Sequence, residues 1–442
     1  MTFMPVHTID SARAWLAEHG IAWVRLEWPD LNGFARGRVV PISAFIEKDA
    51  TPPIFFCDAC LSFDLNSVPV AANASSAGRE FGNVQAVPDL DTLRLWPAQP
   101  RTAWCLCDVL LPSGEPAATA PRGFTRRIGA ELARLGLACR VSPELEFYLT
   151  TADGQPLERG SPCYGLEASG GFEGAMERIL AAVAIFWTVE GWHHEHGPGQ
   201  FEINVRHAPL QEAADALYAT RVAIRAAAMQ SGLRATFLSK PFNGLNGSSC
   251  QLNFSLQDPQ GTALFSDPKG PHGLSDTCRH FVGGILEHLD ALAAVLLPNA
   301  NSFRRIVPGH FAPIAKAWGV DNRSAALRVV GTSPASTRVE VRVPGADIAS
   351  HLAIPALLAA GLHGVRTRRS PAAPARGNLE AAADRIIDDW GRALEAFERS
   401  TWIAETLGTE LAAQFLAVKR HEYGRFRAHV SDFDRQEYGS QF

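Results

Sequence analysis

Long hydrophobic runs and blocks of like charge are absent from this chain of 442 residues, and their absence excludes several classes of protein. The longest apolar runs, Ala181–Val189 and Leu352–Leu362, are shorter than the roughly 20 residues of a membrane-spanning helix. The first ten residues lack the basic and apolar regions of a secretory signal. The net charge is −5 without a basic block, which argues against a nucleic-acid partner. We therefore expect a cytoplasmic protein that binds neither membranes nor nucleic acid.

Cysteine is also sparse, with eight residues in the chain. In a cytoplasmic protein such cysteines are usually free thiols. Cys57 and Cys60 have the spacing of half a zinc site, and Cys105 and Cys107 form a second close pair. However, Cys105 and Cys107 alternate with Leu106 in an expected strand, and Cys57 follows three apolar residues. The pattern favours buried, inert thiols over a zinc site.

The residues that are present indicate a globular enzyme with two domains. Hydrophobic residues make up 46% of the chain and charged residues 20%, and 442 residues exceed one ordinary core. Up to residue 110 a short helix (8–20) precedes short strands, with a hairpin formed by 22–28 and 35–40. The Pro-, Gly- and Ser-rich residues 111–121 are the best linker candidate. Expected helices then follow at 123–135, 174–190, 210–231, 275–297, 352–363 and 379–398. We predict an α+β fold with domains at residues 1–115 and 116–442.

Four expected strands share one design, in which polar residues occupy one face and apolar residues the other. They are residues 142–147, 201–205, 251–256 and 338–343. A single strand of this kind is most often a solvated outer face, but four together favour convergence on one site. The second strand follows His193–Gln200, a segment rich in imidazoles and glycine. A sheet curved around these faces would gather five acids, Glu144, Glu146, Glu195, Glu202 and Glu340. Such carboxylate clusters suit Mg²⁺ or Mn²⁺.

Arginines in loop-like sequence complement these acids. They lie in residues 301–305 and 321–328, where Gly and Pro are frequent. Guanidinium groups match phosphate and carboxylate oxygens, although any one of these arginines could equally form a surface salt bridge. The chain has neither a Walker glycine loop nor a Rossmann fingerprint. Acids and arginines without such loops indicate phosphoryl transfer through metals and guanidinium groups.

These motifs, in this order, resemble the glutamine synthetase family along nearly the whole chain. The motifs are residues 30–38, 88–89, 144–147, 240–241, 246–248, 301–313, 322–328 and 340–342. The resemblance implies a small N-terminal β-grasp domain and a larger catalytic domain with a curved antiparallel sheet flanked by helices. It also implies a ring-shaped homododecamer with active sites between neighbouring subunits. Residues 308–313, 317–323, 343–347 and 430–433 resemble the branch of γ-glutamyl-amine and γ-glutamylpolyamine synthetases.

The resemblance also implies the substrates and the role of each site residue. The substrates are glutamate, ATP and an amine, with Mg²⁺ or Mn²⁺ as cofactor. Glu146, Glu195 and Glu202 would hold the metal near glutamate, and Glu144, Gln251 and Glu340 the metal near ATP. Arg305 and Arg342 would bind glutamate and the transferred phosphoryl group, with Asn246 and Gly247 beside the glutamate. Arg323 and Arg328 would bind phosphates, His193 and Ser255 would lie near the nucleotide, and Arg305, Arg323 and Asp58 would be the catalytic residues.

The chain departs from the family pattern at two places. Glutamine synthetases have a proton-accepting glutamate where this chain has Phe311, whose ring suits an organic amine better than ammonium. They have two histidines where this chain has Gln251 and Asn253, so a neutral amide replaces an imidazole ligand. Asp58 lies near the family's ammonium-site aspartate, but a turn aspartate is an equal interpretation.

Three functions therefore stay open. The first is ligation of an organic amine to the glutamate γ-carboxylate through a γ-glutamyl phosphate. The second is a binding or regulatory protein with impaired catalysis, and the third is ordinary ammonia-dependent glutamine synthesis. The retained acids favour the first function over the second, and Phe311 disfavours the third.

Overall fold

The computed structural model describes residues 8–48, 50–70, 82–157, 162–166, 172–331 and 333–441. Its first part is a sheet with the strand order β2-β1-β6-β4-β3, in which β5 also pairs with β6. The expected hairpin is present, and its first strand pairs in parallel with β6. The strands are β1 (Trp23–Pro29), β2 (Ala35–Pro41), β3 (Ile54–Cys57), β4 (Asn83–Pro88), β5 (Arg94–Leu95) and β6 (Thr102–Leu110). Short helical elements accompany them: α1 (Ile9–Glu18), α2 (Ile42–Phe45), η1 (Asp58–Ser62) and η2 (Leu90–Thr92).

The second sheet contains the four strands that the sequence singled out, as direct neighbours. The order is β13-β14-β15-β12-β7-β9-β8, with β10 and β11 also paired to β7. The polar-faced strands are therefore consecutive, and their registers place Glu144 opposite Gln251 and Glu146 opposite Glu202. The strands are β7 (Ala138–Thr150), β8 (Val189–His194), β9 (Gln200–Val205), β10 (Ala208–Pro209), β11 (Arg234–Thr236), β12 (Cys250–Gln257), β13 (Ala315–Val320), β14 (Ala325–Val330) and β15 (Arg338–Val341).

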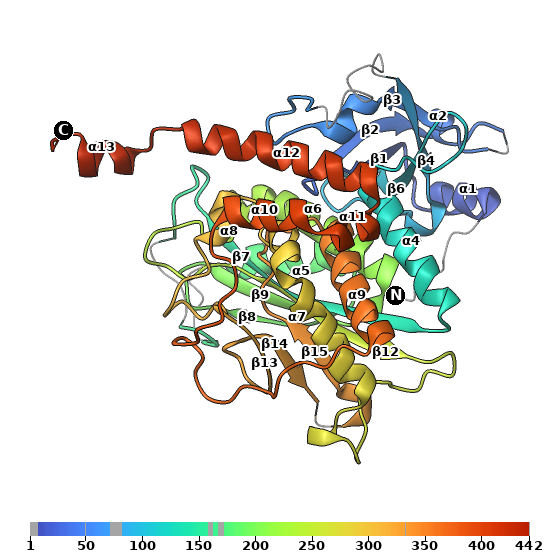
Figure 1. The fold of residues 1–442 in the computed structure, drawn as a ribbon. Helices are drawn as coiled ribbons and strands as arrows, with labels where there is room; N and C mark the ends of the chain where they lie inside the picture. Colours follow the sequence, from blue (N-terminus) through green and yellow to red (C-terminus); the bar gives the residue numbers. More distant parts are fainter. Residues whose placement is uncertain are drawn as a thin grey trace.

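This sheet is mixed, whereas the sequence predicted an antiparallel one. The edge strands β13 and β14 pair in parallel, and the remaining pairs are antiparallel. Alternation of polar and apolar residues carries no information about strand direction, so the sequence pattern could not distinguish the two. The predicted α+β fold class is otherwise confirmed (Figure 1).

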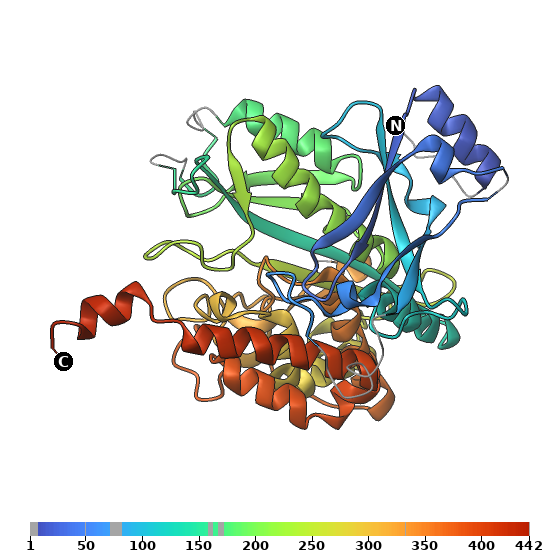
Figure 2. The same ribbon diagram turned by 90° about the horizontal axis from the view of Figure 1, so that it is seen from above.

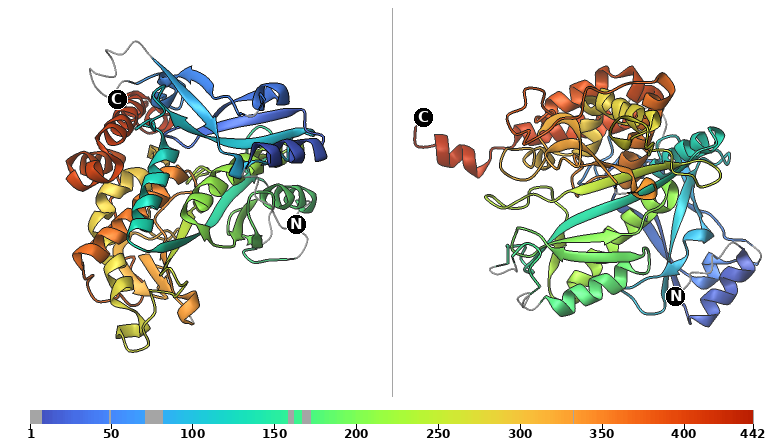
Figure 3. Two further views of the ribbon diagram at one scale, coloured as in Figure 1. Left: turned by 90° about the vertical axis from the view of Figure 1, so that its right-hand side faces the viewer. Right: turned by 90° about the horizontal axis from the view of Figure 1, so that it is seen from below.

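Helices cover the apolar face of the second sheet and build the larger core. That core contains residues of α6, α7 and α9 packed on β7, β9 and β12. Figure 3 shows α4 between the two sheets, both of which it contacts. The helices are α4 (Pro121–Arg134), α5 (Glu173–Val183), α6 (Leu210–Gln230), α7 (Asp276–Leu296), α8 (Ala300–Phe303), α9 (Ser350–Thr367), α10 (Trp390–Arg399), α11 (Thr401–Leu407), α12 (Thr409–Ala428) and α13 (Asp432–Tyr438). Two further short turns are η3 (Pro271–Gly273) and η4 (Pro334–Ser336).

Two of the expected helices were too long. Residues 174–190 form a helix only to Val183, and from Val189 the chain is strand β8. Residues 185–189 are mostly β-branched or aromatic, and such residues favour strands. The helix expected at 379–398 begins only at Trp390, because the Asp389 side chain accepts the backbone N–H of Arg392 and caps the helix there.

A buried ion-pair network joins the two sheets. Arg122, in the first turn of α4, donates to Asp89 and Asp108 at 2.6 Å and to Asp215 of α6 at 2.8 Å. The Arg122 guanidinium holds the pKa of Asp215 well below its usual range despite burial. Separate hydrophobic cores lie under each sheet. The domain boundary at residue 115 stays a prediction.

Helix α12 packs against α10 and α11 and adds Leu411, Phe415 and Val418 to the larger core. In Figure 1 α12 runs along the outside of the molecule, and in Figure 2 α13 extends beyond it. Phe433 and Tyr438 of α13 are exposed. No helix within the described ranges is long and apolar enough to cross a membrane. Cys105 and Cys107 are buried free thiols, as expected, and burial raises the pKa of Cys105 to about 12.

Candidate active site

A cavity of roughly 680 Å³ lies over the shared polar face of β12, β7 and β9. Most of the predicted site residues line it: Glu144, Glu146, His193, Glu195, Glu202, Asn246, Gly247, Gln251, Arg305, Phe311, Arg323, Arg328 and Arg342. Glu340 is fully buried beneath it and contacts two of its arginines. Strand pairing brings the acids together. Arg305 and Arg323 follow α8 and β13, Arg328 lies in β14, and Arg342 directly follows β15. The cavity therefore combines hard oxygen donors with guanidinium groups.

One side of the cavity is acidic and has little compensating charge. His193 Nε2 lies 3.0 Å from Glu195 and 3.9 Å from Glu202. The three residues form a group that could hold a metal ion. Burial and the neighbouring Glu195 raise the pKa of Glu146 to about 7. Burial, Glu146 and Glu144 raise the pKa of Glu202 to about 9. A divalent cation would relieve this repulsion.

His193 thus lies beside the acids assigned to the glutamate side, although the resemblance assigned it to the nucleotide. The register of β8 on β9 explains this, because His193 stands directly opposite Glu202. The ring of Tyr164 stacks on the His193 ring at a centroid distance of 4.4 Å. The imidazole therefore has a fixed plane with one edge toward the carboxylates.

The other side of the cavity holds a buried acid, Glu340, that is already paired with two arginines. Glu340 accepts hydrogen bonds from Arg328 at 3.0 Å and from Arg342. Arg342 also donates to the amide oxygen of Gln251 at 2.5 Å. Burial and Glu340 raise the pKa of Glu144. On this side the predicted metal ligands Gln251 and Glu340 have guanidinium partners, and Glu144 remains the acid without one.

Asn253, at the family's second histidine position, has its own set of partners. It donates to Glu144 at 3.0 Å and accepts from Arg338 at 2.9 Å. Ser255, two residues further, lines a neighbouring cavity of roughly 490 Å³. Both cavities are bordered by Glu144 and Arg338. Ser255 is thus separated from the main cavity by one layer of side chains.

Arg305 is buried at the floor of the cavity. It donates to the carbonyl oxygens of Val343 and, at 3.1 Å, of Pro344, while its Nε has no protein partner. Burial lowers the pKa of Arg305 to about 10, which leaves it charged near neutral pH. A side chain at Gly247 would collide with Arg305, since an added Cβ would lie 2.5 Å from its Cγ. The Arg305 guanidinium, which lines the cavity, and the tight glycine turn suit recognition of an anionic substrate group.

The flap of the cavity carries Phe311 in a left-handed backbone conformation, with φ of 56°. The ring stacks on His196 at a centroid distance of 4.6 Å and an interplanar angle of 8°. Phe311 is 70% exposed, so one ring face is free to contact a ligand. Asp58 lies outside the cavity, in η1 of the N-terminal sheet, and one of its carboxylate oxygens is buried without a partner.

Sequence reasoning missed two residues that position the acids. Ser249 donates its backbone N–H at 2.9 Å and its hydroxyl at 2.6 Å to Glu146. Gln200 donates to Glu146 at 3.3 Å and to the carbonyl of Gly247 at 3.0 Å. Gln200 shares the polar face of its strand with Glu202, so the alternation could have identified it. Ser249 lies two residues before Gln251 and continues the alternation of β12 by one step, so the same pattern could have identified it.

Comparison with known proteins identifies the family. The glutamine synthetase catalytic domain matches residues 118–438. The chain is 30% identical to the glutamine synthetase of Thermotoga maritima, over 98% of this chain and 99% of that protein. It is 29% identical to a glutamate–isopropylamine ligase of a Pseudomonas species, over 96% of each chain. A solved structure of GmaS with ADP has a TM-score of 0.85 and 27% identity, covering 97% of this chain and 99% of that one.

The fold and the acid and arginine cavity define an ATP-dependent glutamate–nitrogen ligase. The chain belongs to the glutamine synthetase family. A glutamine synthetase and an amine ligase are about equally similar to it, so the choice of branch stays a prediction.

Proposed function

We propose that the protein joins an organic amine to the γ-carboxylate of glutamate through a γ-glutamyl phosphate. Phe311 carries this proposal, because it borders the acid and arginine cavity with an aromatic ring where the family has a proton-accepting glutamate. An exposed ring face can pack the carbon part of an amine and attract its cationic form. Ammonium offers no carbon surface for such a contact. The similarity to a glutamate–isopropylamine ligase is consistent with an organic amine.

The acids fit the divalent cations that the family uses. Glu146, Glu195 and Glu202 would hold the ion on the glutamate side, and Glu144, Gln251 and Glu340 the ion on the nucleotide side. All six offer oxygen donors, which suit Mg²⁺ and Mn²⁺. When bound, these ions would neutralise phosphate charge during attack by a carboxylate on ATP. The raised pKa values of Glu146 and Glu202 show that buried negative charge lacks compensation there.

The arginines would act on the anions that react. Arg305 lines the cavity, where its guanidinium can bind a carboxylate of glutamate. Arg342 and Arg323 also line it and can stabilise the phosphoryl group in transfer. An oxygen of the γ-carboxylate attacks the γ-phosphorus and ADP leaves. The amine nitrogen then attacks the acyl carbon, phosphate leaves, and the nitrogen loses a proton.

The test is release of ADP from glutamate, ATP and Mg²⁺ with each of a panel of amines. The panel contains ammonia, methylamine, isopropylamine, a diamine such as putrescine, and benzylamine. We expect turnover with at least one organic amine at a kcat/KM at least tenfold above that for ammonia. Efficient turnover with ammonia alone would favour glutamine synthesis. A folded protein without turnover on any member would contradict both reactions.

A second candidate function is a binding or regulatory protein without catalysis. It rests on Gln251 and Asn253, whose side chains are engaged with Arg342, Glu144 and Arg338. This alternative expects weak or absent ATP binding in the presence of Mg²⁺. Calorimetry that gives tight, Mg²⁺-dependent ATP binding would exclude it. Catalytic rescue of a silent protein by histidines at positions 251 and 253 would support it.

A further inference from the structure

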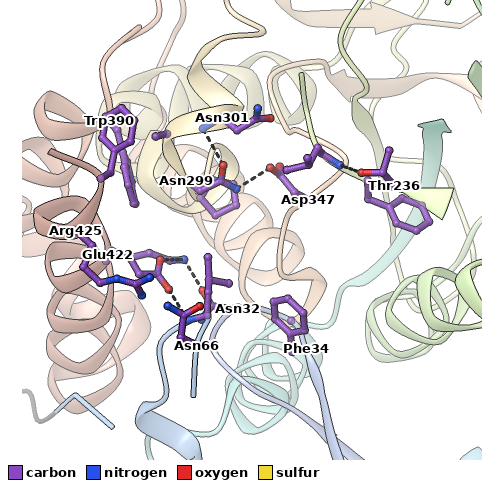
Figure 4. A pocket seen from close by; sticks show the side chains of 18 of the residues that line it. Asn32, Phe34, Asn66, Thr236, Asn299, Asn301, Asp347, Trp390, Glu422 and Arg425 are labelled. Carbon is purple, nitrogen blue, oxygen red and sulfur yellow. Dashed lines mark hydrogen bonds and ion pairs between the residues drawn. The ribbon is translucent and has the colours of Figure 1, made fainter. Parts of the chain in front are cut away.

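A second large cavity, of roughly 930 Å³, lies outside the candidate active site. It is formed by segments far apart in the sequence: the turn at 32–34, residues 65–66, helix α6, the segment after β11, helix α8, and helices α10 and α12. Figure 4 shows Asn32, Phe34 and Asn66 on one side, with Asn299 and Asp347 across from them and Glu422 and Arg425 on α12. None of its lining residues borders the catalytic cavity.

The lining is cationic in a protein whose net charge is negative. Arg425 pairs with Asp64, a buried acid outside the lining, at 2.7 Å. The lining itself holds five cationic side chains against two carboxylates: Arg221, Arg225, Arg304, Lys419 and Arg425 against Asp347 and Glu422. Both carboxylates are already engaged. Asp347 accepts from Ser239, Asn299 and Ser302 at 2.8–2.9 Å. Glu422 accepts from Lys419 at 3.0 Å and from the backbone of Leu65 at 3.2 Å.

Three of the guanidinium groups lack an acidic partner. Across the described ranges, Arg221, Arg225 and Arg304 form no ion pair. Arg221 donates to the carbonyl of Ala346, and the other two lie over the rings of Phe237 and Phe426. Arg221 is only 5% exposed, and its neighbour Arg225 is one helical turn further along α6. Desolvation and Arg221 lower the pKa of Arg225 to about 10. An anion that accepts two or more hydrogen bonds would stabilise such a pair of guanidinium groups.

Aromatic surface completes the cavity. Phe34 and Phe426 are 44% and 43% exposed, and Trp390 and Phe237 also line the cavity. The walls are preformed, because Asn299 donates to Asp347 at 2.8 Å and caps α8 through its own side-chain oxygen. Asn301 is fixed by Lys240, whose backbone N–H it accepts at 2.8 Å. A rigid pocket with guanidinium groups at one part and aromatic faces at another selects for a ligand that has both an anionic group and an apolar group.

We infer that this cavity binds a small organic anion in which a phosphomonoester is attached to a flat apolar group. The dianionic phosphate pairs with Arg225 and Arg221, and the ring packs between the aromatic side chains. A phosphate is preferred to a carboxylate because its three oxygens can accept from two adjacent guanidinium forks. The site is independent of the proposed ligase activity.

Calorimetry on the full chain with phenyl phosphate tests this inference. We expect saturable binding of one molecule per chain, at least tenfold tighter than inorganic phosphate or phenol. Arg225→Gln should weaken it about tenfold, as for loss of a charge-assisted pair. Arg134→Gln, on the exposed surface of α4, is the matched control and should change nothing. Phe426→Ala should weaken phenyl phosphate binding but leave phosphate binding unchanged.

The catalytic cavity also attracts phosphate, so Arg323→Gln separates the two sites. Binding that is lost in Arg323→Gln and kept in Arg225→Gln would overturn the inference. Equal affinity for phenyl phosphate and inorganic phosphate would overturn the inference that aromatic side chains bind the ring. Absence of phenyl phosphate binding to the folded native protein would overturn the whole inference of an anion site. Because binding is measured without ATP, glutamate or amine, failure of the ligase proposal leaves this result unaffected.

Discussion

The two sides of the active-site cavity differ in how the charge of their buried carboxylates is compensated. On the glutamate side, burial and neighbouring carboxylates raise the pKa of Glu146 to about 7 and that of Glu202 to about 9. On the nucleotide side, Glu340 is buried completely but pairs with Arg328 and Arg342, and Glu144 is the acid whose pKa burial and Glu340 raise. The acids of the first side need a bound cation, whereas the second side already carries two guanidinium groups. The replacement of histidine by Gln251 is consistent with this, since its oxygen accepts from Arg342.

The difference predicts opposite effects of mutations on stability. Removing an acid from the glutamate side relieves repulsion in the metal-free protein. Removing an arginine from the nucleotide side leaves a buried carboxylate without its partner. Most of the following experiments test how the buried carboxylates are compensated on one side of the cavity.

The largest effect is expected for Glu202→Gln. The amide keeps the acceptor for Asn204 but removes the charge that would hold the glutamate-side metal. We expect ADP release to fall about a thousandfold, as for loss of charge stabilisation in transfer. Thermal unfolding without metal should shift upward above about pH 9, where the native carboxyl of Glu202 is ionised, because one desolvated charge is gone. Glu190→Gln, at an exposed ion pair, is the control. Activity within tenfold of the original would contradict the role of Glu202.

Arg342→Gln tests the other side. It leaves Glu340 with Arg328 alone in a buried position. We expect a loss of about 3 kcal/mol in the free energy of unfolding, the usual scale for breaking a buried pair. Urea denaturation measures it, and Arg206→Gln at the surface pair with Glu190 should cost less than about 1 kcal/mol. If Arg342→Gln were as stable as the original chain, the arginines would not compensate the acid.

Phe311→Ala separates amine recognition from the chemical step. The ring borders the cavity but contacts neither set of acids. We expect the KM for the preferred organic amine to rise about tenfold, from loss of apolar contact, with kcat nearly unchanged. Phe433→Ala, on the exposed surface of α13, should have no effect. A fall in kcat with an unchanged KM would show that the flap acts in the chemistry instead.

The smallest effect is a pH dependence of stability. A carboxyl whose pKa is raised on folding binds more protons in the native state, so the metal-free protein loses stability as the pH rises from the unfolded value of 4.5. For Glu146 this loss ends near pH 7 and for Glu202 near pH 9. We expect the rise in Tm on adding Mg²⁺ to be larger at pH 9 than at pH 6. A shift that is equal at both pH values would contradict raised pKa values.

Strand alternation is a local property, so the sequence predicted which face of its strand each acid occupies. The adjacency of the four strands is not local, and it entered as the hypothesis that their polar faces converge. Glu144, Glu146, Glu202 and Glu340 had the right faces, and the sheet brought those faces together. The sequence could not show that Arg342 contacts Gln251, because that contact depends on the register between β15 and β12. The left-handed backbone at Phe311 also has no sequence pattern.

The second cavity lay further beyond sequence reasoning. Its lining comes from five or more segments, and Arg221 and Arg304 meet there only through the packing of α6, α8 and α12. The helix predicted at residues 210–231 is α6, but no sequence pattern assigned its arginines a role. The helix end predicted at residue 190 was wrong, since α5 ends at Val183 and the following residues prefer a strand.

Titration with Mn²⁺ followed by electron paramagnetic resonance tests the comparison most directly. Without nucleotide, one Mn²⁺ per chain should bind tightly at the uncompensated glutamate side, and Glu202→Gln should remove it. A second ion should bind tightly only after ATP is added, since arginines already neutralise Glu340 on the nucleotide side. Two equally tight Mn²⁺ ions without ATP, or none, would contradict the difference in charge compensation between the two sides.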